Sequence, residues 1–183
     1  MVQALRELLE DPNCNEASVK EALFSFQCAN VENDDDDVVR FLREYAIGFE
    51  KDGTTRTYLI IDDDQASKGT LQINGYFAIA IKNLYFRNTD PKVLEEIFGD
   101  ASKQSCPAFL IGQLARGTCS SKGEGAQYLI TALSYIAEAS NIVGGRFVYL
   151  DCSPERQSYY EEHGFTFLQQ KHRSPLIQMY RVI

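Results

Sequence analysis

The sequence predicts a mixed α/β fold, and three observations lead to it. Apolar residues recur at helical spacing through residues 1–50. From Thr54 the chain changes to runs rich in β-branched and aromatic residues, which are typical of strands. From about Cys106 such runs alternate with amphipathic stretches, in the order strand–helix–strand–helix–strand–strand. We therefore expect helices first, then an antiparallel pair of strands, then this alternating half.

Three helices are expected in residues 1–50. The first contains a leucine repeat that stops at Pro12, the second covers residues 16–28, and the third covers residues 38–49. The run Asp34-Asp35-Asp36-Asp37 precedes the third helix. It is either a calcium-binding run or an exposed loop with an N-cap, where negative charge suits the positive end of a helix. The run lacks the ligand spacing of a calcium-binding EF-hand, which favours the exposed loop with an N-cap.

Residues 54–99 are expected to form two strands and a short helix. The run TRTYLIIDDD predicts the first strand, and TLQINGYFAIAIKNL predicts a longer second strand, with Gly75 marking a bulge. A polar loop through Gly69 joins the two as an antiparallel pair. The helix falls between Asn88 and Gly99, with Pro91 near its start.

The C-terminal half has the clearest order. Strongly apolar runs predict its two central strands, and glycines break or end its helices. The expected elements are the strand CPAFLIGQLA, the polar loop of residues 116–122, a helix from about Ala126 to Gly144, the strand RFVYLDC, a helix from Ser153-Pro154 to Gly164, and the closing strands FTFLQQ and LIQMYRVI.

The composition argues against several classes of protein. The formal net charge is −8 and the pI is near 4.8, whereas a nucleic-acid binder usually carries a basic excess. Five cysteines without a C-x-x-C spacing and only two histidines supply a structural zinc site poorly. The first residues lack the apolar stretch of a signal peptide, and no uncharged run is long enough to span a membrane. We expect a cytoplasmic protein with reduced thiols, no metal and no membrane contact.

The stretch SKGEGAQYL, residues 121–129, resembles a phosphate-binding loop. It fails the Walker A pattern because Lys122 precedes the glycine, and it fails the dinucleotide pattern because Tyr128 stands at the third glycine position. Two interpretations remain. It is either a short anion cradle built from a loop and a helix N-terminus, or the flexible start of an ordinary helix.

The order of FLIGQLA, the loop ending in K-G-E-G, a helix, FVYLDC and YYEEHGF resembles the GNAT superfamily of acyl-CoA-dependent N-acetyltransferases. GYFAIA, IGQLA and YYEEHGF together are also similar to the toxin-like branch of that family. The resemblance implies a mixed, mostly antiparallel central sheet with splayed central parallel strands, flanked by helices and preceded by an extra helical N-terminus. It further implies a single domain over residues 1–183, with a helical part at 1–50, a GNAT-like core at 54–183, and acetyl-CoA as the acyl donor.

The resemblance also assigns site residues. Gly123 and Gly125 match the two small positions of the family's pyrophosphate loop, whereas Ser120 stands where the family prefers Gln or Arg. Tyr160 falls on the tyrosine that protonates the leaving thiolate; the alternative is a core tyrosine on an amphipathic helix. Ser153 occupies a position where many members carry an Asn that contacts the cofactor. The implied cofactor-binding residues are Leu114, Ala115, Arg116, Lys122, Gly123, Glu124, Gly125, Ala126 and Ser153.

The general base is less evident from the sequence. Gln113 stands where some members carry a carboxylate, and an amide cannot accept the proton, so water is the expected route. His163 is expected to cap a helix end, and His172 to lie exposed in a basic cluster. An acyl-cysteine at Cys119 or Cys152 would need a histidine partner, and structural thiols are commoner.

The function implied is an N-acetyltransferase that moves an acetyl group from acetyl-CoA to a primary amine of a small molecule or peptide by direct attack. Two alternatives stay open: a toxin-like acetyltransferase of aminoacyl-tRNA, and a non-catalytic acyl-CoA-binding regulatory module. Because of the net charge of −8, nucleic acid is considered an unlikely partner. A homodimer is possible.

Overall fold

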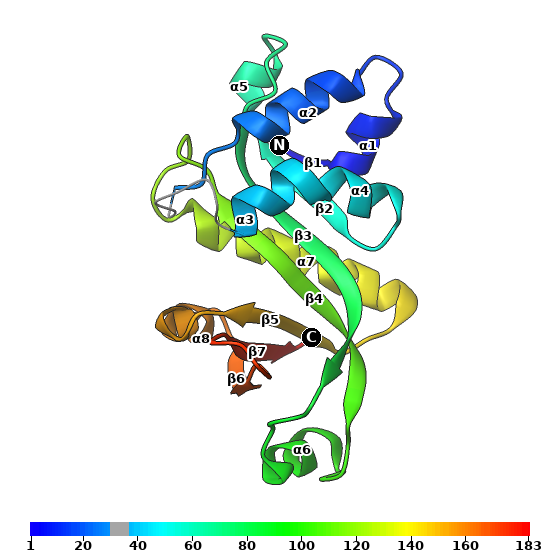
Figure 1. The fold of residues 1–183 in the computed structure, drawn as a ribbon, viewed down its shortest axis with the longest axis vertical. Coiled ribbons are helices and arrows are strands. Elements are labelled where there is room, and N and C mark those ends of the chain that lie inside the picture. The colour runs from blue at the N-terminus through cyan, green and yellow to red at the C-terminus, as the bar shows by residue number, and fades with distance from the viewer. Residues whose placement is uncertain (30–36) are drawn as a thin grey trace. The chain divides into compact units, whose positions relative to one another are not determined.

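The computed structural model describes residues 1–29 and 37–183 (Figure 1). Its strands form a mixed sheet in the order β1-β2-β3-β4-β5-β7-β6, with helices beside it, as predicted. The question of calcium or loop at Asp34, Asp35 and Asp36 lies outside the described residues. The strands are β1 (Val2–Ala4), β2 (Arg56–Ile61), β3 (Ile73–Tyr85), β4 (Ser105–Arg116), β5 (Phe147–Cys152), β6 (Thr166–Gln170) and β7 (Ile177–Val182).

The helices follow the predicted order except for α5, which lies at Asp63–Ala66, where the end of a strand and a polar loop were predicted; four residues are too few to show a helical period. The second half of the chain has one long helix and a short one that opens with a 3-10 turn. The third N-terminal helix contains a π-helical segment, η1, which the periodicity did not indicate. The helices are α1 (Leu5–Glu10), α2 (Glu16–Ser25), α3 (Asp37–Arg40), η1 (Phe41–Tyr45), α4 (Ala46–Lys51), α5 (Asp63–Ala66), α6 (Pro91–Phe98), α7 (Glu124–Val143), η2 (Pro154–Arg156) and α8 (Gln157–Glu162).

The chain divides into two compact units. Unit 1 comprises Met1–Ala80 and Gly112–Tyr135, and unit 2 comprises Ile81–Ile111 and Ile136–Ile183. The strands β3 and β4 and the helix α7 each contribute residues to both units. The single domain over residues 1–183 stays a prediction.

Unit 1 buries the apolar faces of the N-terminal helices against β2 and β3. Its core contains Leu5, Leu23, Leu42, Leu59 and Tyr76, each fully buried. Burying one such side chain stabilises the fold by about 1.5–3 kcal/mol relative to leaving it exposed. The helical periodicity of residues 1–50 therefore reflects a shared core, as the amphipathic pattern predicts.

The antiparallel pair β2–β3 is confirmed, and β1 extends it. Val2 of β1 pairs with Ile60 on the outer side of β2. With three residues, β1 is too short to be found from periodicity. The β2–β3 register shifts between Ile60 and Ile61, so that Gly75 is opposite Ile60 and Ile73 is opposite Ile61. The bulge predicted at Gly75 is therefore present next to it, at Asn74.

Unit 2 contains the parallel pair of the sheet. Phe109 and Leu110 of β4 pair with Val148 and Tyr149 of β5, and β7 then lies antiparallel between β5 and β6. The helix α6 begins at Pro91 with an Asp90 cap, whose carboxylate accepts from Lys92 N at 2.8 Å. The predicted parallel central strands are confirmed, and the splay beyond them stays a prediction.

Candidate cofactor loop and catalytic tyrosine

The loop between β4 and α7 is anchored at its start by backbone hydrogen bonds. Gly117 N donates to Asn74 O at 2.8 Å, and Thr118 N donates to Gln27 O at 2.9 Å. On the other side, Ala29 N donates to Arg116 O at 2.8 Å. The beginning of the loop is therefore held between β3 and the segment that follows α2.

Ser120 fixes the middle of the loop. Its side chain is buried, and its hydroxyl donates to Asn74 O and shares a hydrogen bond of 2.7 Å with the Tyr128 hydroxyl. The Tyr128 hydroxyl also lies 3.0 Å from Glu124 Oε2, and with its one proton it donates either to this carboxylate or to Ser120. Where the family prefers a long polar side chain, this chain therefore has a short hydroxyl that points into the protein and links the loop to β3 and α7.

The predicted residues at the end of β4 lie on alternating faces. Ala115 is buried, whereas Leu114, Arg116 and Gln113 are half-buried. The Arg116 guanidinium donates to Ser120 O at 2.7 Å, so its side chain helps to shape the loop. Contact of the backbone of Leu114, Ala115 and Arg116 with a pantetheine arm stays a prediction.

The start of α7 has the features of an anion cradle. Gly123 has φ of 101°, a conformation that favours glycine, and it turns the chain into the helix. Glu124 N and Ala126 N are used by Ser121 O and Gly123 O. Among the described residues, the backbone N–H groups of Lys122, Gly123 and Gly125 donate to no protein acceptor. These groups are available to an anion at the positive end of the helix.

The side chains around this helix start leave it open. The Lys122 amine makes no ion pair within the described part of the chain. A Cβ placed on Gly125 would meet only Arg116 Cβ, at 4.0 Å. The Glu124 carboxylate is held by Tyr128, whose hydroxyl has its pKa raised, chiefly by burial. Lys122, Gly123, Glu124, Gly125 and Ala126 are therefore brought together at one surface of unit 1.

The predicted catalytic tyrosine lies in unit 2. The Tyr160 ring packs edge-on against Tyr159 and Phe165, at centroid distances of 5.1 and 5.8 Å. Its hydroxyl has no partner in the described residues and is not among the enclosed orphan groups, so it touches solvent although the ring is buried. Burial raises the pKa of Tyr160 to about 12, and the Arg156 charge partly opposes that shift. Tyr160 therefore fits both interpretations: its ring packs in the core, as for a core tyrosine, and its hydroxyl is free, as a catalytic tyrosine requires.

Three other residues named by the sequence analysis also lie in unit 2. Ser153 precedes η2 and is half-buried; a serine directly before the Pro154 of a predicted helix start would be expected to act as its N-cap, but its side chain makes no capping hydrogen bond. His163 Nδ1 lies 2.6 Å from Tyr159 O and its ring lies against Tyr159, which fits the predicted helix-end role. Burial raises the pKa of Cys152 to about 11, so this thiol is protonated near neutral pH and is a poor nucleophile.

Two further properties concern the described residues alone. No group of three or more His, Cys, Asp or Glu residues that could hold a metal ion occurs in residues 1–29 and 37–183. Within the same ranges, no helix is long and apolar enough to cross a membrane.

Solved structures are similar to this chain over its whole length, although no family model matches its sequence. One is a bacterial toxin, with a TM-score of 0.72 and 14% identity over 100% of this chain and 91% of the other. Another is AtaT complexed with acetyl-methionyl-tRNA, with a TM-score of 0.70 and 16% identity over 100% and 94% of the two chains. A third is AtaTR bound with acetyl-CoA, with a TM-score of 0.67 and 16% identity over 100% and 92%. The chain has a GNAT-like fold.

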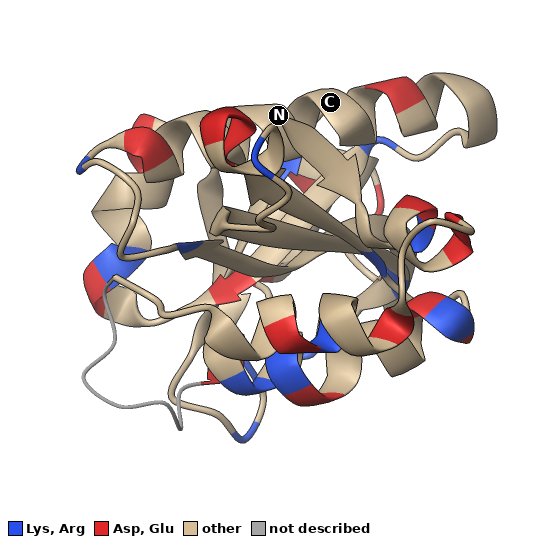
Figure 2. Cartoon of the chain, turned by 90° about the horizontal axis from the view of Figure 1, so that it is seen from above, with Lys and Arg blue, Asp and Glu red and all other residues tan. Residues whose placement is uncertain are grey.

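The comparison corrects one prediction. A small-molecule or peptide amine as the partner, with nucleic acid unlikely, is wrong, because a protein of the same fold is found with a tRNA. The prediction rested on net charge, which averages over the chain. Unit 1 contains the entire excess of −8, whereas unit 2 has nine basic and nine acidic residues. Along the ribbon, basic and acidic positions are interspersed and lie mostly on helices and loops (Figure 2).

Sequence reasoning missed the residues that hold the loop, although one signal for them existed. Asn74, Ser120 and Tyr128 form a network that no motif describes. A Cβ on Gly75 would collide with the Tyr128 ring and would lie 2.8 Å from Ala115 O. A glycine within a long strand marks such a close approach, so Gly75 indicated that something large packs on β3 there.

Proposed function

We propose that this chain transfers the acetyl group of acetyl-CoA to the α-amino group of an aminoacyl-tRNA. The observation that carries the proposal is the full-length fold similarity to AtaT complexed with acetyl-methionyl-tRNA and to AtaTR bound with acetyl-CoA. At 16% identity that similarity establishes the fold, so the proposal also depends on the chemistry of the residues in the two units.

The cofactor's pyrophosphate would bind at the start of α7. Three N–H groups, of Lys122, Gly123 and Gly125, have no acceptor among the described residues, so they are available to an anion. The Lys122 ammonium adds a positive charge, and the small side chains at Gly125 and Ala126 let a phosphate approach the backbone. Ser120 supports this arrangement from within the loop and does not itself contact the phosphates.

The transfer itself is a single displacement. The amine nitrogen attacks the thioester carbonyl carbon, a C–N bond forms, and the C–S bond breaks to release the CoA thiolate. An α-amino group has a pKa of roughly 7.7–8.0, so a substantial fraction is already neutral near neutral pH, unlike a lysine amine at about 10.4. An α-amine acceptor therefore suits a site with Gln113 in place of a carboxylate, because water can take the remaining proton.

Tyr160 would stabilise the departing thiolate. With a pKa of about 12 it stays protonated throughout the neutral range. Complete proton transfer to a thiolate whose conjugate thiol has a pKa of about 8.5 is uphill by several pKa units. Tyr160 therefore acts first as a hydrogen-bond donor to the developing negative charge, and solvent supplies the proton that finally remains on sulfur.

The test uses the full chain with acetyl-CoA and aminoacylated tRNA. We expect free thiol and acetylated aminoacyl-tRNA to appear in equal amounts, and uncharged tRNA to give neither. Acetyl-CoA binding without any transfer to a set of aminoacyl-tRNAs would overturn the proposal and would favour a non-catalytic acyl-CoA-binding module.

A further inference from the structure

Unit 1 contains a cavity that the proposed transfer does not use. It has a volume of about 410 Å³, which falls in the range of small-ligand sites. Its walls come from α1, α4 and the start of β2. The lining residues are Arg6, Leu9, Glu10, Glu50, Lys51, Gly53 and Arg56. Five of the seven are charged, so the cavity suits a charged ligand rather than an apolar one.

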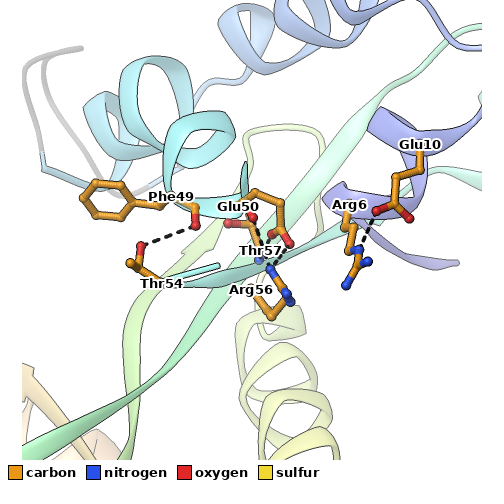
Figure 3. A network of polar contacts seen from close by, with 7 residues as sticks. All are labelled: Arg6, Glu10, Phe49, Glu50, Thr54, Arg56 and Thr57. Carbon is orange, nitrogen blue, oxygen red and sulfur yellow. Dashed lines mark hydrogen bonds and ion pairs between the residues drawn. The ribbon is translucent and has the colours of Figure 1, made fainter. Parts of the chain in front are cut away.

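Arg56 is held rigidly at one wall. Its Nη1 group donates to Glu50 Oε1 at 2.7 Å and to Glu50 O at 3.2 Å. The Glu50 side chain is only 2% exposed and also accepts from Thr57 N at 2.9 Å, so both carboxylate oxygens are engaged (Figure 3). A buried, fully hydrogen-bonded carboxylate thus fixes the orientation of a guanidinium that is itself 40% exposed.

The free side of this guanidinium is the one that recognises phosphates. Within the described residues, every hydrogen bond of Arg56 uses Nη1, so the Nε and Nη2 N–H groups have no protein acceptor. That Nε–Nη2 edge is the fork that binds two oxygens of a phosphate at once. Because Glu50 already orients the fork, little side-chain entropy is lost on binding.

Arg6 and Lys51 are the other cations of the cavity, and each forms only a weak, exposed ion pair. Arg6 Nε contacts Glu10 Oε1 at 2.6 Å, and Lys51 Nζ contacts Glu16 Oε2 at 2.8 Å. Each of the four side chains is at least 41% exposed, and such surface pairs contribute about 0–1 kcal/mol. Either cation can therefore exchange its carboxylate for a phosphate at small cost.

We infer that this cavity binds a backbone phosphate of the RNA substrate, with Arg56 as the fixed fork and Arg6 and Lys51 as movable cations. The inference rests on the proposed function for the identity of the nucleic acid. The cavity places three cations against two lining carboxylates, and one of these, Glu50, is saturated within the protein. The lining residues alone therefore carry a net charge of +1, although unit 1 as a whole is acidic.

The experiment measures binding of uncharged tRNA to the full chain by fluorescence anisotropy over a range of salt concentrations. Arg6→Ala, Lys51→Ala and Arg56→Lys are compared with Arg40→Ala, which removes an exposed cation paired with Asp37 elsewhere in unit 1. Arg56→Lys keeps a positive charge beside Glu50, so the fold is preserved while the fork is lost. Acetyl-CoA affinity and acetyl transfer are measured on the same proteins.

We expect each cavity variant to weaken tRNA binding about 3- to 10-fold, and the two alanine variants to lower the salt slope by about one. The Arg40→Ala protein should stay within about 2-fold of wild type, and acetyl-CoA affinity should not change in any of them. Equal tRNA affinity and salt slope in wild type and all three cavity variants would overturn the inference, while transfer to aminoacyl-tRNA would leave the proposed function standing.

Two more outcomes separate the possibilities. If wild type transfers no acetyl group yet binds uncharged tRNA in a way that depends on Arg6 and Arg56, the proposed function fails and the cavity inference stands. Inorganic phosphate and adenosine monophosphate serve as small probes. If these bind with a dependence on Arg56 while tRNA does not bind, the RNA assignment is overturned in favour of a small phosphate ligand.

Discussion

The Ser120 hydroxyl lies between two groups that the loop has to hold together, the carbonyl of Asn74 and the phenol of Tyr128. Ser120→Ala removes both hydrogen bonds inside a buried site, so we expect a loss of about 1–2 kcal/mol in the free energy of unfolding and weaker acetyl-CoA binding. Urea unfolding and a cofactor titration measure the two effects. The exposed neighbour Ser121→Ala is the control, and equal stability of both variants would contradict the role given to Ser120.

Tyr160 combines a buried ring with a free hydroxyl, so its proposed chemical role can be tested apart from its packing. Tyr160→Phe keeps the ring and removes only the donor. We expect kcat to fall by about 100-fold or more, with unchanged acetyl-CoA affinity and only a small change in stability. Stopped assays of thiol release give kcat, and Tyr159→Phe is the matched control. A kcat within 2-fold of wild type would mean that Tyr160 is a core residue alone.

At the scale of the element, the start of α7 offers a variant that moves stability and binding in opposite directions. Gly125 is inside a helix, has open space around its Cα, and is not in a left-handed conformation. Gly125→Ala should therefore keep or raise stability, by up to about 1 kcal/mol. The added methyl group would stand between the backbone and a pyrophosphate, so acetyl-CoA affinity should fall several-fold. Thermal unfolding and calorimetric titration test this, and unchanged affinity would argue against the cradle.

The same helix shows which elements the sequence predicts and which it does not. The helix α7 and the strand β3 are long and strongly patterned, so their periodicity locates them. The three-residue strand β1 is defined only by its pairing with Tyr58–Ile60, and no local pattern marks so short a strand. In the candidate site, Gly123 has φ of 101°, which agrees with the turn that a glycine there indicates, and its contact with a cofactor stays a prediction. The role of Ser120 could not be predicted from the sequence, because it depends on Asn74, 46 positions away in the chain.

At the scale of the whole molecule, the net charge does not describe the charge of each part of the surface. The acidic excess belongs entirely to unit 1, and even there the lining of one cavity is locally basic. A ligand responds to charges within about a Debye length, roughly 8 Å at physiological salt, and not to the sum over 183 residues. The −8 of the sequence is therefore compatible with a phosphate-binding surface.

The buried tyrosines of unit 2 also make the free energy of unfolding depend on pH. Burial raises the pKa of Tyr149 and of Tyr160 to about 12, whereas an unfolded tyrosine ionises near 10. Below pH 10 the two phenols are protonated in both the folded and the unfolded state, so their contribution to the free energy of unfolding is fully present. Between pH 10 and 12 they ionise only in the unfolded state, which favours unfolding. We expect the free energy of unfolding to fall across that window. Tyr149→Phe should make the fall shallower, whereas Tyr85→Phe, at an exposed ring, should not. Urea unfolding at pH 9, 10 and 11 measures the slope, and identical slopes for wild type and Tyr149→Phe would show that the buried phenol contributes nothing to it.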